Sequence, residues 1–89
     1  MVAAVVLLRP CATSAGFTAT PERPRRLDMR AVRDRLRAAG YAIVVDAHVI
    51  LIVRKGVESS VYSDGKVLLK TTDREAAERA YAELEPHLE

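Results

Sequence analysis

The chain has 89 residues, a length that accommodates one small domain with a modest core. Apolar residues make up 49% of the chain and charged residues 29%, the mixture of an ordinary globular domain. Cys11 is the only cysteine, which excludes an internal disulfide framework and a multi-cysteine zinc site. The formal charge of +2 is uneven: residues 28–89 carry ten basic and eleven acidic side chains. Their near-neutral balance is less positive than purely electrostatic nucleic-acid binding requires.

Residues 1–26 differ in composition from the rest of the chain. An apolar run at 1–8, too short to span a bilayer, is interrupted by Arg9-Pro10 and followed by small residues and the Pro-Arg segment 21–26. We expect residues 1–26 to be a disordered or leader segment in front of a single domain at 27–89. One explanation of this segment is an over-extended gene start, because Met29 opens a complete structural unit. A signal peptide is the alternative. Without disulfides or a membrane span, we expect a cytoplasmic protein.

The first predicted element of the domain is a helix that starts after Asp28, a suitable N-cap residue, and ends at Gly40. Its apolar stripe recurs at helical spacing through Met29, Val32, Leu36 and Ala39. A basic stripe on the opposite side contains Arg30, Arg33 and Arg37. This stripe is either a solvated face or a set of phosphate contacts.

Four strands and a second helix follow. Runs rich in Val and Ile predict strands at residues 41–46, 48–54, 58–62 and 66–70. Asp64-Gly65 is a strong hairpin signal between the last two strands. Thr72 and Glu75 have the spacing of a capping box, and Pro86 ends the final helix near residue 85. The predicted fold is α+β, with a four-stranded antiparallel curved sheet and two helices on one face, in the order α-β-β-β-β-α.

Successive residues of a strand point to opposite faces of the sheet, so odd and even positions predict which residues share a face. Val61, Val67 and Leu69 are expected to pack under the helices, whereas Ser60, Tyr62, Leu68 and Lys70 lie on the open face. The first two strands are apolar on both parities, which predicts that the open face is covered too. The covering element is a second copy, another partner, or residues 2–8 of the same chain.

The segment from Val61 to Thr71, with its Ser63-Asp64-Gly65-Lys66 hairpin and the helix that follows, resembles a repeat of the TATA-box-binding-protein family. The resemblance covers residues 28–85 and is specific only at the hairpin. It implies that Tyr62 is placed as a wedging residue and that Ser60, Leu68 and Lys70 lie on a concave, groove-facing surface. It also places Leu51 among residues that contact the nucleic-acid backbone. A single repeat would have to form a dimer to build a complete saddle.

These observations lead us to expect a non-enzymatic domain that binds nucleic acid through its open sheet face, as a homodimer. The expected site consists of Tyr62, Leu68, Lys70, Leu51, Ser60, Lys66 and Arg54, with the three basic residues next to phosphates. The alternative is a protein-interaction or dimerisation module with no nucleic-acid role. No motif indicates a catalytic centre, a cofactor, a metal or a small-molecule substrate, and we expect none of these.

Overall fold

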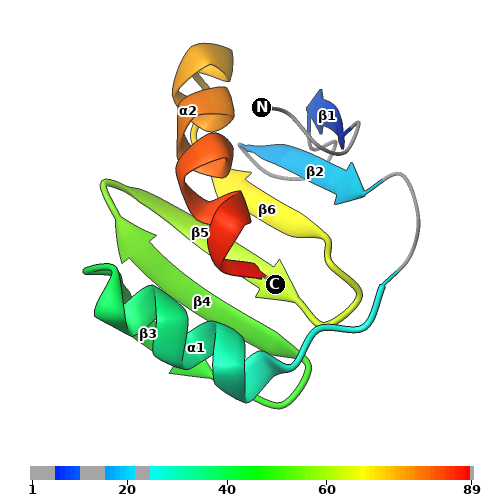
Figure 1. The fold of residues 1–89 in the computed structure, drawn as a ribbon. Helices are drawn as coiled ribbons and strands as arrows, with labels where there is room; N and C mark the ends of the chain where they lie inside the picture. Colours follow the sequence, from blue (N-terminus) through cyan, green and yellow to red (C-terminus); the bar gives the residue numbers. More distant parts are fainter. Residues whose placement is uncertain (1–5, 11–15, 22–24, 89) are drawn as a thin grey trace.

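The computed structural model describes residues 6–10, 16–21 and 25–88. It contains one antiparallel sheet, two α-helices and a C-terminal 3-10 turn, η1 (Figure 1). Across the sheet, the strands follow the order β1-β2-β6-β5-β4-β3. The elements are β1 (Val6–Pro10), β2 (Phe17–Pro21), α1 (Met29–Ala38), β3 (Ala42–Asp46), β4 (Ile50–Lys55), β5 (Val57–Tyr62), β6 (Val67–Lys70), α2 (Arg74–Leu84) and η1 (Glu85–Leu88).

Both ends of α1 form as the sequence predicts. The Oδ1 atom of Asp28 accepts a hydrogen bond from the backbone N–H of Ala31 at 3.2 Å, which satisfies one of the free amides of the first turn. Gly40 has a φ of +97°, a left-handed conformation that glycine adopts at little cost after a helix. The predicted stripe is confirmed, because Val32 and Leu36 are fully buried.

The four strands predicted after this helix are also present, with small shifts in their bounds. Strand β4 begins at Ile50 rather than at residue 48, because residues 47–50 form the turn, where the backbones of Ala47 and Ile50 hydrogen-bond each other. At the β5–β6 turn, Gly65 donates its N–H to the carbonyl of Tyr62 at 2.9 Å. Gly65 has a φ of +96°, and it alone supplies the positive φ in this turn.

The N-cap of α2 differs from the prediction by one residue. The helix begins at Arg74, so Asp73 rather than Thr72 is the capping residue, and its Oδ1 accepts from the N–H of Glu75 at 3.0 Å. Thr71 Oγ1 in turn accepts from the N–H of Asp73. The carboxylate of Asp73, rather than the hydroxyl of Thr72, therefore caps the helix. Pro86 lies within η1, just after the α-helical turns.

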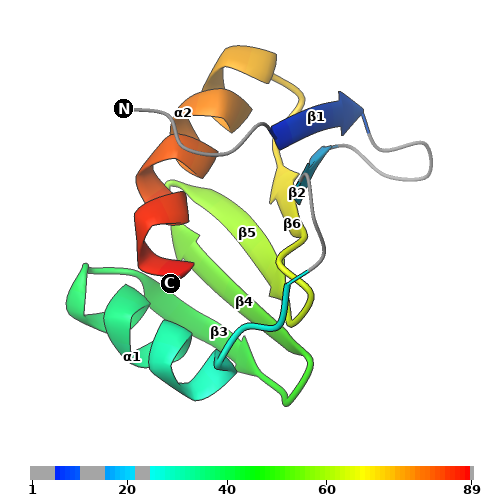
Figure 2. The ribbon, with the colours of Figure 1, turned by 45° about the vertical axis from the view of Figure 1, so that its right-hand side comes forward.

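The sheet has six strands instead of the four that we predicted, because β1 and β2 extend it beyond β6. Strand β2 pairs with β6 in the register Phe17–Leu69 and Ala19–Val67, and both Phe17 and Ala19 are buried in the core. The disorder expected for residues 1–26 is therefore wrong for the part that the structure describes. Figure 2 shows this β1–β2 hairpin against β6, at the edge of the sheet far from β3. The described part of the apolar run, residues 6–8, thus does not cover β3 and β4.

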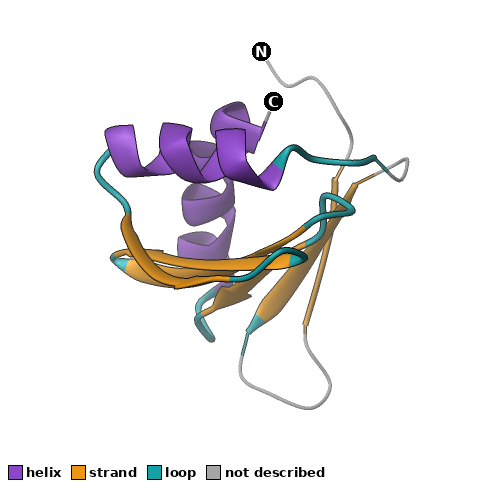
Figure 3. Ribbon diagram, turned by 90° about the horizontal axis from the view of Figure 1, so that it is seen from below, coloured by secondary structure: helices purple, strands orange, loops and turns teal. Residues whose placement is uncertain are grey.

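Both helices lie on one side of the sheet, and the opposite side carries no helix (Figure 3). The buried strand residues face the helices in two rows of the register, as parity predicted for Val61, Val67 and Leu69. The helices and η1 complete this core with Val32, Leu36, Ala77, Leu84 and Leu88. The α+β class and the one-sided placement of the helices are therefore confirmed.

Candidate interaction face of the sheet

The open face of the sheet begins with a charged row. Arg54 on β4, Glu58 on β5 and Lys70 on β6 lie side by side in the strand register. Arg54 Nη2 lies 3.1 Å from Glu58 Oε1, and Lys70 Nζ lies 3.3 Å from Glu58 Oε2. Hydrogen bonds from Arg54 and Lys70 lower the pKa of Glu58 below its ordinary value. One carboxylate thus pairs with both cations, which leaves the row of two cations and one anion with a small net positive charge.

An apolar row lies next to the charged one. Val45 on β3, Ile52 on β4, Ser60 on β5 and Leu68 on β6 are consecutive partners across the sheet. Ile52 and Leu68 are partly exposed, whereas Ser60 is only 3% exposed. The short side chain of Ser60 lies between these two larger neighbours, so it has little access to a ligand.

A second apolar pair, Ile50 and Tyr62, lies beyond this row. Both side chains are partly exposed. The Ser63 N–H donates to the Val49 carbonyl at 3.0 Å, which ties the β3–β4 turn to the end of β5. The apolar surface therefore continues from the middle of the sheet to this turn.

The most exposed large apolar residues cluster at the β3 side of the face. Val44 is 43%, Val45 41% and Val49 64% exposed. The register shifts between Ile43 and Val45, which places Val44 at a β-bulge in the edge strand. A bulge in an edge strand disfavours uncontrolled pairing with another strand, but it leaves the apolar side chains accessible.

The structure brings five of the seven predicted site residues to exposed or partly exposed positions on this face or its rim. Tyr62, Leu68, Lys70 and Arg54 lie on the open face, and Lys66 is exposed after the β5–β6 turn. Of the other two, Ser60 lies on the face but is buried. Leu51 is 1% exposed and pairs with Val61 in the row under the helices. Its assignment to the contact surface was wrong, because strand β4 is apolar on both parities and its pattern does not reveal which residues face inward.

Residues that the sequence analysis left out of the site contribute more of the surface. Ile50, Ile52, Val45 and Val49 supply apolar area on the open face and its edge. The register with β5 would have identified Ile50 and Ile52, because they pair with Tyr62 and Ser60. That register follows from the turn at Gly56, on either side of which Lys55 and Val57 pair.

The described residues contain neither a candidate metal site nor a long apolar helix. Across 6–10, 16–21 and 25–88, no group of three or more His, Cys, Asp or Glu residues is arranged to hold a metal ion. Burial raises the pKa of Tyr41 and of Tyr81, which keeps both phenols protonated over a wider pH range. In the same parts of the chain, neither helix is long and apolar enough to cross a membrane.

Comparisons with other proteins add no assignment at this point. No protein-family model, curated protein or solved structure matches this chain. The open face and the distribution of charge over the surface are therefore the features that bear on the function.

Proposed function

We propose that this chain is a non-enzymatic interaction domain that forms a homodimer through the open face of its sheet. The observation that carries the proposal is the apolar surface around Val45 and Val49, which are 41% and 64% exposed on a domain of only 89 residues. Contiguous apolar surface of this kind is typical of an interface, because a partner removes it from water.

The charges on the same face favour a second copy as the partner. Glu58 lies between Arg54 and Lys70, so the face carries little net charge and two copies would approach each other without strong repulsion. The charged row lies to one side of the apolar rows. This arrangement resembles an interface with an apolar centre and a polar rim.

The double substitution V45K/V49K is expected to convert the dimer into a monomer. Each lysine would bring an unpaired charge into the apolar interface, where desolvation is costly. Light scattering coupled to size-exclusion chromatography, over a range of protein concentrations, measures the mass of the particle. The expected mass is twice that of the chain for the wild type and once that of the chain for the variant.

The matched control is A38K/A82K, which adds the same charge at two exposed alanines of α1 and α2. This variant should remain dimeric, because both positions lie on the helix side of the sheet. A wild type that stays monomeric at every concentration, or a dimer that survives V45K/V49K, would refute the proposed interface.

Nucleic acid is the second candidate ligand of this face, favoured by Tyr62. The partly exposed ring of Tyr62 neighbours the apolar side chain of Ile50, as in surfaces that stack or wedge against bases. The similarity of residues 61–71 to a TATA-box-binding-protein repeat points in the same direction.

If a base stacks on this ring, the substitution Tyr62→Ala should weaken the binding of a short mixed-sequence duplex by about 1–3 kcal/mol. Fluorescence anisotropy of a labelled duplex measures the change, and Tyr62→Phe is the control because it keeps the ring. Equal affinities for all three proteins would remove Tyr62 from any nucleic-acid site.

A further inference from the structure

Positive charge is concentrated in one short segment on the helix side of the molecule. Residues 25–37 contain six arginines, no lysine and two aspartates, a net charge of +4 in a chain whose formal net charge is +2. The rest of the chain is therefore acidic on balance, with a net charge of −2. In residues 73–85, which include α2, five acidic residues face two arginines. The molecule is thus electrically asymmetric, and its basic end is α1 with the segment before it.

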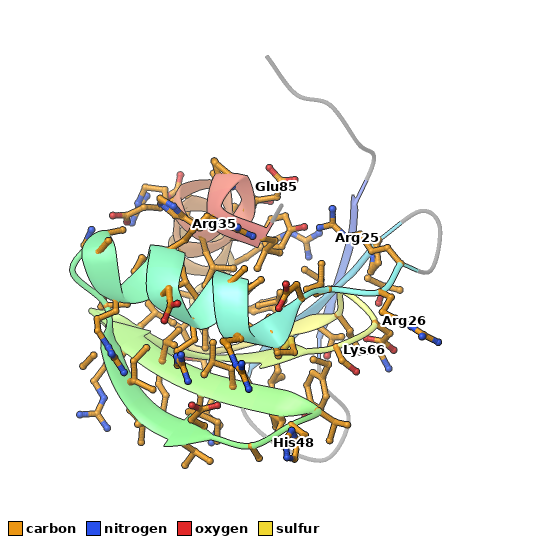
Figure 4. All side chains as sticks on the ribbon, turned by 60° about the horizontal axis from the view of Figure 1, so that its bottom comes forward. Arg25, Arg26, Arg35, His48, Lys66 and Glu85 are labelled. Carbon is orange, nitrogen blue, oxygen red and sulfur yellow. The ribbon has the colours of Figure 1, made fainter. Side chains whose placement is uncertain are left out.

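Three of these arginines line a groove of about 410 Å³ between residues 25–28, α1 and the C-terminal turn. Arg35 reaches the groove from α1, and its Nε donates to the backbone carbonyl of His87 at 2.9 Å, which orients the guanidinium. Arg25 and Arg26 line the groove from the preceding segment. Figure 4 labels the three arginines in a view from the α1 side. Leu27 and Leu88 supply apolar wall.

The segment that carries Arg25 and Arg26 is attached to the sheet through its backbone. The N–H of Leu27 donates to the carbonyl of Ser63 at 2.9 Å, and the N–H of Arg25 donates to that of Asp64 at 3.3 Å. A second depression of about 390 Å³ lies between the same two arginines and the β5–β6 turn. Lys66 follows this turn and is exposed (Figure 4). Positive side chains therefore continue from α1 across residues 25–26 to the hairpin.

The other flank of α1 adds further cations. Arg33 is held by Asp34 and Asp46, each at 3.0 Å, and has a structural role between α1 and β3. Arg30 and Arg37 are exposed, and the ion pairs of the described residues include neither of them. Arg26 is exposed and Arg35 is partly exposed, and neither takes part in these ion pairs. We call the surface formed by Arg25, Arg26, Arg30, Arg35 and Arg37 the arginine surface.

We infer that the arginine surface binds the phosphate backbone of a nucleic acid. Guanidinium groups match phosphate oxygens in charge and in fork geometry, which explains the use of arginine alone. The cations lie on both flanks of a helix about 15 Å long, so they fit a row of phosphates better than a single small anion. On the open sheet face, by contrast, Arg54 and Lys70 already form ion pairs with Glu58. This site lies on the other side of the sheet and does not depend on the proposed dimer interface.

The test compares two triple variants that each remove three exposed cations. R26A/R30A/R37A removes them from the arginine surface, and K55A/R74A/R79A removes them from β4 and α2. Anisotropy of a labelled mixed-sequence DNA duplex is measured over a series of salt concentrations. R26A/R30A/R37A should bind at least about tenfold more weakly, with a salt slope shallower by about 2 to 3. The K55A/R74A/R79A variant should retain the wild-type slope, and circular dichroism should show both variants folded.

Several results would overturn the inference. One is a wild-type protein that does not bind the duplex, or binds it without salt dependence, and this measurement needs no variant. Another is an equal loss of affinity in both triple variants, or a loss confined to K55A/R74A/R79A, which would place the contact elsewhere. Competition by polyglutamate as effective as that by unlabelled duplex would assign the surface to acidic proteins instead.

Discussion

Replacement of Leu69 with alanine is expected to lower the free energy of unfolding by about 2–5 kcal/mol, because it leaves a cavity in the centre of the core. Leu69 is completely buried on β6, where it lies between Ser59 of β5 and Phe17 of β2 in the register and faces the helices. Close packing around this side chain allows little relaxation after truncation. Urea denaturation followed by circular dichroism measures the change in unfolding free energy.

The control for this prediction is the neighbouring leucine. Leu68 lies on the opposite face of the same strand and is partly exposed, so Leu68→Ala removes the same atoms from a site that is already in contact with water. We expect less than half of the loss seen for Leu69→Ala. Equal losses in the two variants would contradict the assignment of Leu69 to the core and Leu68 to the open face.

The second large effect is expected at β2. Phe17→Ala should destabilise the protein by about 3 kcal/mol, because the ring is 8% exposed and packs against the core beside Leu69. The guanidinium of Arg74 lies 5.8 Å from the centre of this ring and would lose a cation–π contact as well. The measurement is again urea denaturation of the full chain.

Thr18→Ala is the matched control, since Thr18 is the next residue of β2 and pairs with Leu68 on the open side. It is partly exposed, and its truncation should change the stability by about 1 kcal/mol or less. If Phe17→Ala were as mild as Thr18→Ala, strand β2 would not be a stabilising part of the sheet, and the core would consist of the later strands and helices alone.

Local signals in the sequence were sufficient for the elements from α1 to α2. The spacing of Val32 and Leu36 selects the buried stripe of α1, and Asp28 and Gly40 mark its ends, because each acts within a few residues of its own position. Alternation at Val67 and Leu69 likewise selects the helix-facing side of β6. For these elements, the residues that determine the structure lie within the element or directly next to it.

Other features depended on contacts between distant residues. Strand β2 reads as a stretch of small residues, and it becomes a strand because β6 provides its hydrogen-bond partners about 50 residues later in the chain. The sequence also did not show which side chains of β4 face the helices, since Ile50, Leu51 and Ile52 are all apolar. Only pairing with Val61 turns Leu51 toward the helices.

The same distinction between local signals and tertiary contacts applies to the two proposed surfaces. The sequence by itself determined that the strands carry more apolar residues than two helices can cover, and that α1 bears an arginine stripe. Tertiary structure alone decided that the uncovered residues include Val45 and Val49, and that Arg25 and Arg26 join Arg35 around one groove. The physical reason is that composition and periodicity are local properties of the chain. Shared surfaces, in contrast, arise when strand register and backbone hydrogen bonds bring separate segments together.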